Sequence, residues 1–248
     1  MRTTVLRSVV LAGLLAALPL ARADDDATAR RIAILQSLEA PEGAVAKTWP
    51  GVPGRLLVGW TVIRPDSDDD ANSPLRHVDL TLVLVQTSTA RVLARTTFPA
   101  VWQSDAIEFR AIQLDTAAWT LAAGQRAFGV RAFFAHPGRL TVSSETHLSL
   151  FDVRGSTIAP VLSDLLVDET IESGQCGVYR QRHVTLAVAS TRSHGHADLA
   201  LDAKGMDAKD ARVEPPATCP DEVKREWKDV LRYDGTRYVI PAAIDGLP

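Results

Sequence analysis

Cysteine and aromatic residues are scarce in this chain, and positive charge is not in excess. Only 2 of its 248 residues are cysteine and 6% are aromatic, so a zinc site built from several cysteines is excluded. The formal net charge of -3 provides no basic surface for nucleic acid. With Gly 15 and Pro 14, the chain is neither collagen-like nor of low complexity.

Common catalytic and cofactor-binding motifs are also missing. The sequence contains no G-x-S-x-G, no H-E-x-x-H, no phosphate-binding loop and no G-x-G-x-x-G, and each of these motifs supplies a nucleophile, a metal site or a phosphate cradle. After the first 23 residues no apolar run reaches the roughly 20 residues of a membrane-spanning helix. We therefore expect no cofactor and no membrane span, and enzymatic activity is not favoured.

The N-terminus has the pattern of a secretory signal peptide. Arg2 and Arg7 precede an apolar run over residues 9–18, and Ala21-Arg22-Ala23 is a small-residue cleavage site. The alternative, a membrane anchor, needs a longer apolar run. The sequence thus predicts a signal peptide over residues 1–23 and a periplasmic or secreted protein.

The two cysteines are interpreted through that compartment. Cys176 and Cys219 are too far apart for a CxxC redox motif. In an oxidising compartment an isolated pair favours one disulfide, whereas in the cytosol both thiols would be free. Because export is expected, we predict a Cys176–Cys219 disulfide.

Short runs of alternating apolar residues dominate the region after residue 50. Turn-forming Ser, Gly, Pro, Asp and Asn residues separate them, as hairpins require. Six such runs predict an antiparallel β-sandwich-like fold within an N-terminal region over 24–153; they cover 55–63, 77–87, 91–98, 107–114, 126–134 and 140–153. A second β-rich region is expected over 154–248, with strands around 184–188 and 198–202.

One or two short helices are expected beside these strands. Residues 30–38 place apolar side chains on one helical face, and residues 115–121 are rich in alanine. Residues 156–169 fit a helical period, although the segment directly follows a strand. We predict a short helix there and a boundary between two regions at Gly155.

The chain ends in a predicted β-hairpin. Asp234-Gly235 favours a two-residue type I′ turn, which would pair Tyr233 with Thr236 and Leu231 with Tyr238. This tail resembles the Tyr-x-x-Asp-Gly-x-x-Tyr strand pairs of exported bacterial proteins of the FG-GAP and VCBS type. Members of that family bind calcium and build propellers; the resemblance here implies an exported β-rich protein.

Two polar segments are candidate metal sites. Asp66, Asp68 and Asp70 alternate as in calcium loops, but Ala71 and His77 stand where an EF-hand needs Gly and an acid. We favour a solvated hairpin loop. His194 and His196 would share a strand face and bind zinc or copper, but the glycine between them favours an ordinary hairpin tip.

The tail aromatics Trp227, Tyr233 and Tyr238 form either a candidate binding surface or part of a core, and the neighbouring Leu231 and Ile240 favour a core. We expect a non-enzymatic binding or accessory module of the cell envelope, whose partner is an unknown envelope protein or glycan. The alternatives are an envelope hydrolase with a site assembled from distant residues, and a calcium-dependent adhesion or assembly module.

Overall fold

The computed structural model describes residues 18–66, 75–136, 138, 141–173, 177–208 and 222–241. The chain divides into two compact units, residues 1–40 and 41–248. The first unit contains α1 (Leu18–Ser37), which confirms the helix predicted from residue 30. Most of the predicted signal peptide lies outside the described residues. No helix among the described residues has both the length and the apolar character needed to cross a bilayer.

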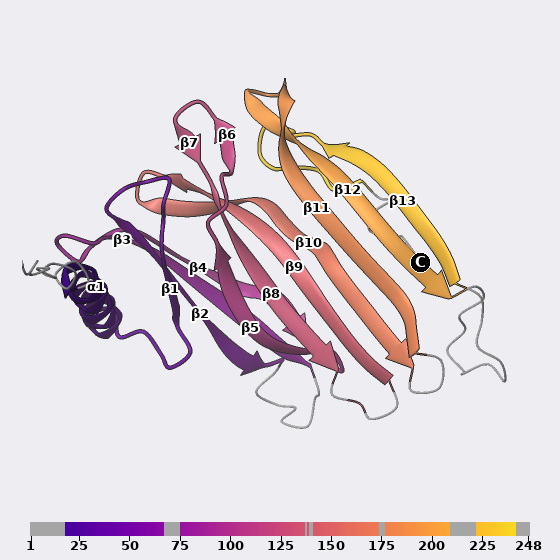
Figure 1. Cartoon of the computed structure of the whole chain (residues 1–248), viewed down its shortest axis with the longest axis horizontal. Coiled ribbons are helices and arrows are strands. Elements are labelled where there is room, and N and C mark those ends of the chain that lie inside the picture. Colours follow the sequence, from indigo (N-terminus) through magenta and orange to yellow (C-terminus); the bar gives the residue numbers. More distant parts are fainter. Residues whose placement is uncertain are drawn as a thin grey trace, which may run out of the picture. The chain divides into compact units, whose positions relative to one another are not determined.

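The second unit is built from antiparallel strands, which confirms the mainly β, sandwich-like prediction. A four-stranded sheet has the order β1-β2-β3-β4, and a seven-stranded sheet has the order β13-β12-β11-β10-β9-β8-β5 (Figure 1). The strands are β1 (Val45–Thr48), β2 (Arg55–Pro65), β3 (Arg76–Gln86), β4 (Arg91–Ser104), β5 (Glu108–Asp115), β6 (Thr120–Ala122), β7 (Gln125–Arg126), β8 (Phe128–His136), β9 (Thr141–Arg154), β10 (Thr157–Ser173), β11 (Gly177–Ser193), β12 (His196–Ala208) and β13 (Glu222–Leu231).

The β5–β8 pairing sets the architecture around the candidate site. The small hairpin β6–β7 is inserted between these two strands in sequence, yet β5 and β8 pair directly over residues from Glu108 to Asp115. The inserted segment therefore leaves the sheet at its edge and returns to it. This insertion brings the residues after β5 over a face of the seven-stranded sheet.

A first core fills the space between the two sheets. Alternate residues of β3, such as Leu80 and Leu82, belong to the same buried cluster as Phe128 and Val130 of β8. Phe128 also stacks on Phe151 of β9, with ring centroids 5.8 Å apart. Burying each such side chain stabilises the fold by about 1.5–3 kcal/mol. Because alternate residues of these strands place their apolar side chains on one face, this burial holds the two sheets against each other.

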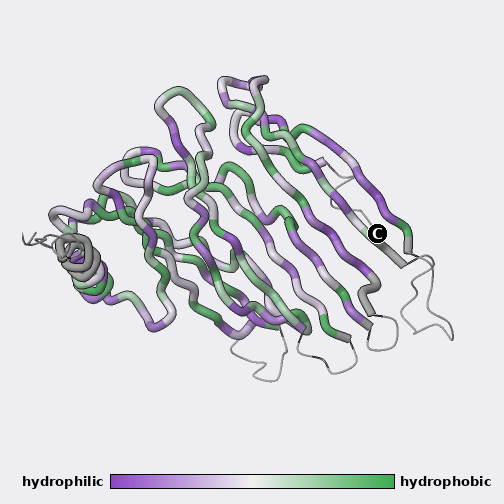
Figure 2. Tube along the Cα trace, viewed as in Figure 1, coloured by the Kyte–Doolittle hydropathy of each residue, from purple (hydrophilic) through white to green (hydrophobic). Residues whose placement is uncertain are grey.

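A second core covers the opposite face of the seven-stranded sheet. Successive side chains of a strand point to opposite faces of the sheet. Phe151 of β9 faces the first core, so Leu148 and Leu150 face the other side. They pack with Leu121 of the β6–β7 hairpin and with Leu231 at the end of β13. In Figure 2 the hydrophobic residues accordingly run along β9 and β10.

The helix predicted over residues 156–169 is wrong, because this segment forms most of β10. It pairs with β9 on one side and β11 on the other. The register with β9 shifts between Pro160 and Leu162, and again between Leu162 and Leu165. Each bulge interrupts the alternation by a residue, so the buried apolar residues recur at spacings that imitate a helix. The expected boundary at Gly155 falls in the turn between β9 and β10.

The short helix expected over residues 115–121 is also wrong. Asp115 ends β5, and its Oδ1 accepts a hydrogen bond from the Ala117 N–H at 2.9 Å. This side-chain bond replaces the backbone bond that a helical turn would make. Thr120 already belongs to β6.

The terminal hairpin is present, but its predicted pairing is wrong. Tyr233 pairs with Tyr238, not with Thr236, and β13 itself pairs with β12. The four-residue loop is held by Asp234 Oδ1, which accepts hydrogen bonds from the backbone N–H groups of Thr236 and Arg237. These bonds lower the pKa of Asp234 to about 2. The Asp234 side chain therefore stabilises a four-residue loop here, although the Asp-Gly dipeptide alone favours a two-residue type I′ turn.

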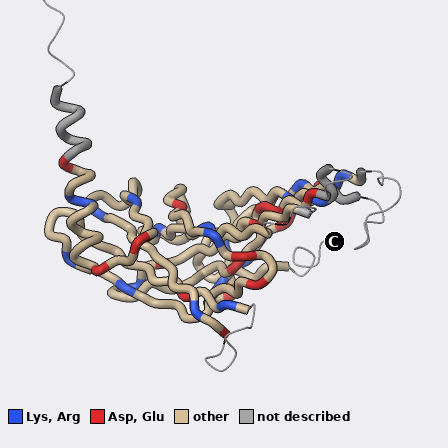
Figure 3. Tube along the Cα trace, turned by 90° about the horizontal axis from the view of Figure 1, so that it is seen from below, with Lys and Arg blue, Asp and Glu red and all other residues tan. Residues whose placement is uncertain are grey.

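Strand β13 forms one edge of the seven-stranded sheet within the described residues. Its solvent face carries both signs of charge, as Figure 3 shows for this part of the chain. Lys228 lies 3.1 Å from Asp202, and Lys204 lies 3.8 Å from Glu226. Charges of this kind protect an open strand edge from pairing with a further strand.

Candidate functional site

The calcium-loop candidates are described only in part. Asp66 Oδ1 lies 2.6 Å from His77 Nε2, whereas Asp68 and Asp70 lie outside the described residues. The imidazole therefore contacts the one aspartate of the loop that the structure describes. A calcium-dependent role stays a prediction. Cys176 and Cys219 also lie outside the described residues, and so the disulfide stays a prediction.

The two candidate histidine ligands lie at the tip of the β11–β12 hairpin. His194 and Gly195 have φ values of 50° and 84°, as a type I′ turn requires. His194 Nδ1 lies 2.8 Å from the Tyr233 carbonyl oxygen, and the His196 ring stacks on the Tyr233 ring with centroids 3.9 Å apart. Both side chains hold the terminal segment against the hairpin. Among the described residues, no group of three His, Cys, Asp or Glu is arranged to hold a metal ion.

The tail aromatics belong mainly to the second core. Tyr233 and Tyr238 expose 3% and 2% of their surface, and the Tyr238 hydroxyl donates to the Ala197 carbonyl oxygen at 2.6 Å. Trp227 is half-buried over Gly205. The two tyrosines therefore do not present a binding surface to solvent.

A buried polar cluster lies beneath this tail. Asp152 is fully buried and accepts a hydrogen bond from Gln125 Nε2 at 3.1 Å. Burial raises the pKa of Asp152, although the charges of Arg154 and His196 oppose the shift. Asp198 is 3% exposed. The cluster links β9, β12 and the terminal segment, and the burial of its carboxylates separates it from solvent.

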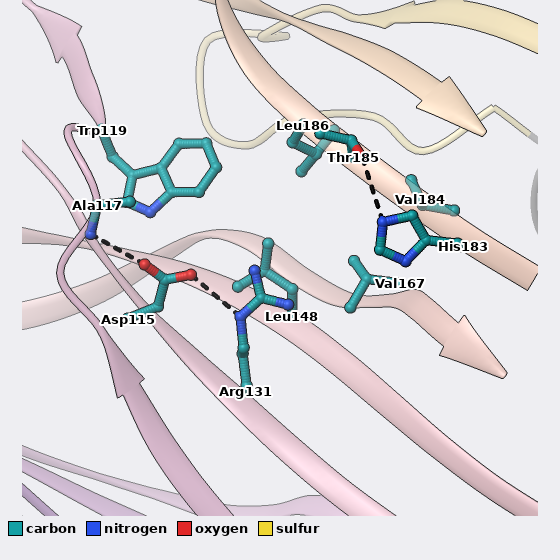
Figure 4. Close-up of a pocket in the computed structure, with 10 residues that line it drawn as sticks. All are labelled: Asp115, Ala117, Trp119, Arg131, Leu148, Val167, His183, Val184, Thr185 and Leu186. Atoms are coloured by element: carbon teal, nitrogen blue, oxygen red, sulfur yellow. Dashed lines mark hydrogen bonds and ion pairs between the residues drawn. The ribbon is translucent and has the colours of Figure 1, made fainter. Parts of the chain in front are cut away.

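A cavity of about 280 Å³ lies on the seven-stranded sheet face that carries the second core. We call it the Trp119 cavity; Figure 4 shows its lining, with Trp119 across from Val184 and Leu186 of β11. Val130 of β8 faces the first core. Its neighbour Arg131 therefore points to the opposite face of the sheet, where the cavity lies. The cavity is lined by Asp115, Ala117, Trp119, Arg131, Leu148, Val167, His183, Val184, Thr185 and Leu186.

Hydrogen-bond donors gather at one end of the Trp119 cavity. The Arg131 Nε–H donates to Asp115 Oδ2 at 3.1 Å, and the terminal nitrogens of Arg131 bond no other described residue. The Trp119 indole N–H is buried and has no hydrogen-bond partner within the described structure. In Figure 4 the indole nitrogen lies on the side of the ring that faces the ion pair. An unpaired buried donor costs about 1–3 kcal/mol.

A second cavity, of about 500 Å³, lies between the sheets at the end of the first core. We call it the His147 cavity; its apolar wall includes Trp102, Val101 and Phe134. His147 Nε2 lies 3.2 Å from Glu145 and its Nδ1 lies 3.1 Å from Asp164.

This geometry fixes the charge of His147. Burial alone would lower the pKa of His147, but the two close carboxylates outweigh burial and raise it to about 9. The ring is therefore an imidazolium at neutral pH. Without a free lone pair it does not act as a general base.

Bulges on both sheets shape the His147 cavity. Asp164 has a φ of 57° within the β10 bulge, where its N–H donates to Ser149 Oγ and its carboxylate accepts from the Trp102 indole at 3.0 Å. Across from it, Ala100 of β4 has a φ of 47° and donates its N–H to Asp79. Strained backbone of this kind persists where surrounding contacts hold it.

A third arrangement has the connectivity of a hydrolase relay. Asp168 Oδ1 contacts His183 Nδ1 at 2.5 Å, and Thr185 Oγ1 lies 3.4 Å from His183 Nε2. The three side chains come from adjacent strands β10 and β11, where Asp168 and His183 are direct partners. However, the His183 side chain is 62% exposed.

Sequence reasoning missed the residues that line both cavities. Glu145 and His147 did carry a signal, because residues two apart on a strand share a face. No local pattern connects Trp119 with Arg131, since only the β5–β8 pairing brings them together.

Comparison of the chain with protein-family models, curated proteins and solved structures gave no match. The functional argument therefore starts from the geometry of the cavities.

Proposed function

We propose that this protein is an exported, non-enzymatic binding protein of the cell envelope, and that its ligand occupies the Trp119 cavity. One observation carries the proposal. Trp119, whose indole N–H has no partner among the described residues, lines the same cavity as Arg131, whose terminal guanidinium nitrogens are free. Ligand sites are typically apolar cavities with a few convergent polar groups. The signal-peptide pattern supports export.

Binding is favoured over catalysis by the state of the polar groups around this cavity. Each oxygen of Asp115 already accepts one protein hydrogen bond, Oδ1 from the Ala117 N–H and Oδ2 from the Arg131 Nε–H. His183 contacts Asp168 through Nδ1, and its side chain is 62% exposed. A general base needs a free lone pair within reach of a substrate proton, and the donors Trp119 and Arg131 supply none.

An envelope hydrolase is the second candidate, and the Asp168–His183–Thr185 contacts favour it. A carboxylate, an imidazole and a hydroxyl in this order can activate a nucleophile. Catalysis of acyl transfer also needs N–H donors that stabilise the oxyanion. The backbone of Asp168 and His183 takes part in the pairing of β10 with β11 instead, which argues against a hydrolase. Ester hydrolysis that disappears in both Thr185→Ala and His183→Ala would establish the hydrolase.

A ligand screen with a blocked cavity tests the proposed binding function. Purified protein without residues 1–23 is screened by thermal shift against small anions, cations and neutral compounds, since a ligand that binds only the folded state raises the Tm. Leu186→Trp fills the cavity, and Val188→Trp is the matched control on the same strand, where Val188 is 37% exposed. We expect a ligand whose Tm shift persists in Val188→Trp and disappears in Leu186→Trp. A screen without any ligand would contradict the proposal.

A further inference from the structure

We propose that the Trp119 cavity binds a carboxylate attached to a short aliphatic body. This inference rests on the proposed binding function and names its ligand class. It is carried by three features of the cavity: an excess of hydrogen-bond donors, a guanidinium whose terminal nitrogens are free, and an aliphatic wall.

The donor excess determines the chemistry of the ligand's polar end. Trp119 contributes an indole N–H, which is donor-only, and Arg131 contributes its terminal N–H groups. Each oxygen of the Asp115 carboxylate already accepts one hydrogen bond from a protein donor. A ligand group that satisfies these donors must accept hydrogen bonds without donating, and an ionised carboxylate does so.

The charges around Arg131 permit an anion. The Arg131–Asp115 ion pair uses the Nε–H of the guanidinium, so the two terminal nitrogens remain for a bidentate contact with the ligand. His183, the other ionisable group in the lining, is engaged by Asp168. Arg131 is 31% exposed, which leaves the guanidinium reachable from solvent while the indole stays buried.

The wall of the cavity determines the body of the ligand. Leu148, Val167, Val184 and Leu186 contribute aliphatic side chains from three neighbouring strands. Each buried methylene of a ligand strengthens binding about fourfold, whereas the volume of about 280 Å³ limits the length of the chain. Hexanoate is therefore the test ligand, because it combines a carboxylate with a short aliphatic chain.

The experiment compares compounds that differ in one feature. Dissociation constants for hexanoate, hexanamide, hexylammonium and acetate are measured by calorimetry at pH 7.5 on the protein without residues 1–23. N-acetyl-leucine is added as a mimic of a peptide C-terminus. We expect hexanoate to bind about tenfold more tightly than hexanamide and acetate. Tighter binding of N-acetyl-leucine than of hexanoate would assign the carboxylate to a peptide end, and the reverse order to a free acid.

Matched variants locate the contact atoms. Trp119→Phe removes the indole donor, and its control is Trp49→Phe, because Trp49 also has a buried unpartnered indole N–H but lies in the first core. Arg131→Lys keeps the charge and removes the forked geometry, with Arg110→Lys as the exposed control. We expect hexanoate binding to weaken about tenfold in Trp119→Phe and Arg131→Lys, and to be unchanged in both controls.

Several outcomes would overturn the carboxylate inference. Hexanamide or hexylammonium binding as tightly as hexanoate would do so, as would equal affinities of Trp119→Phe and Trp49→Phe, or no binding of any carboxylate. If a ligand of another class is blocked by Leu186→Trp, the carboxylate inference fails and the proposed function stands. If hexanoate binds Leu186→Trp normally, both fail.

Discussion

The charge of His147 makes a prediction about stability that can be worked out from the structure. Its pKa rises from the ordinary 6.5 to about 9 on folding, and each tenfold change in proton affinity corresponds to about 1.4 kcal/mol. The side chain is only 18% exposed, so solvent screens the interaction little. Protonation of His147 therefore contributes about 3 kcal/mol to the free energy of unfolding.

The sign of the pH dependence follows from a pKa that is higher in the folded state. The contribution is fully present below about pH 6.5, the ordinary pKa of histidine, and it is lost as the pH rises through 9. Urea unfolding of the wild type and of His147→Gln at pH 6 and pH 10 isolates this contribution, because other titrating groups are common to both proteins. Glutamine does not titrate, so the variant lacks this contribution at both pH values.

We expect the wild type to lose about 3 kcal/mol more than His147→Gln between these two pH values. NMR titration of the His147 ring measures the pKa itself. A difference below about 1 kcal/mol, together with an NMR pKa near the ordinary 6.5, would refute the assignment of His147 as an imidazolium held by Glu145 and Asp164.

Three further predictions concern stability and covalent structure. Gly235→Val should destabilise the protein by about 1–3 kcal/mol in thermal unfolding, because the φ of Gly235 is 106° and a β-branched residue is strained there; an unchanged Tm would contradict this. Tyr238→Phe should cost about 1–3 kcal/mol by leaving the buried Ala197 carbonyl without its donor, and urea unfolding measures it. Cys176 and Cys219 should give no free thiol in the unfolded, unreduced protein, and reduction should cost about 4 kcal/mol; two free thiols would disprove the bond.

The fold was predictable where apolar residues alternate along a strand. The alternation in β3 and β8 is regular, so the sequence predicts both strands and their place in a sandwich. In β10 the bulges around Asp164 interrupt the alternation, and the pairing with β9 and β11 overrides the local pattern. The turn at Asp234 was mispredicted because its loop is held both by the Asp234 side chain, which accepts hydrogen bonds from two backbone N–H groups, and by the backbone bond from the Asp234 N–H to the Arg237 carbonyl oxygen.

The starts of β11 and β13 illustrate how strand order brings distant segments to one end of a sheet. β11 begins at Gly177, directly after Cys176, and β13 begins at Glu222, shortly after Cys219. Both strands run antiparallel to β12, on its two sides, so they start at the same end of the sheet. Sequence spacing alone gives no information on this arrangement, which depends on the order of the three strands.

The cavities depend on tertiary structure even more strongly. Trp119 lies in a segment that leaves the edge of the sheet after β5, and Arg131 lies on β8, so their proximity requires the β5–β8 pairing. An unpartnered indole alone does not identify a site, because Trp49 has one too. What distinguishes Trp119 is that the residue lines a cavity together with Arg131, a guanidinium with free terminal nitrogens. A phenylalanine would fill the second core without the cost of an unpaired donor, and an acceptor at the indole N–H, which the proposed carboxylate would supply, recovers that cost.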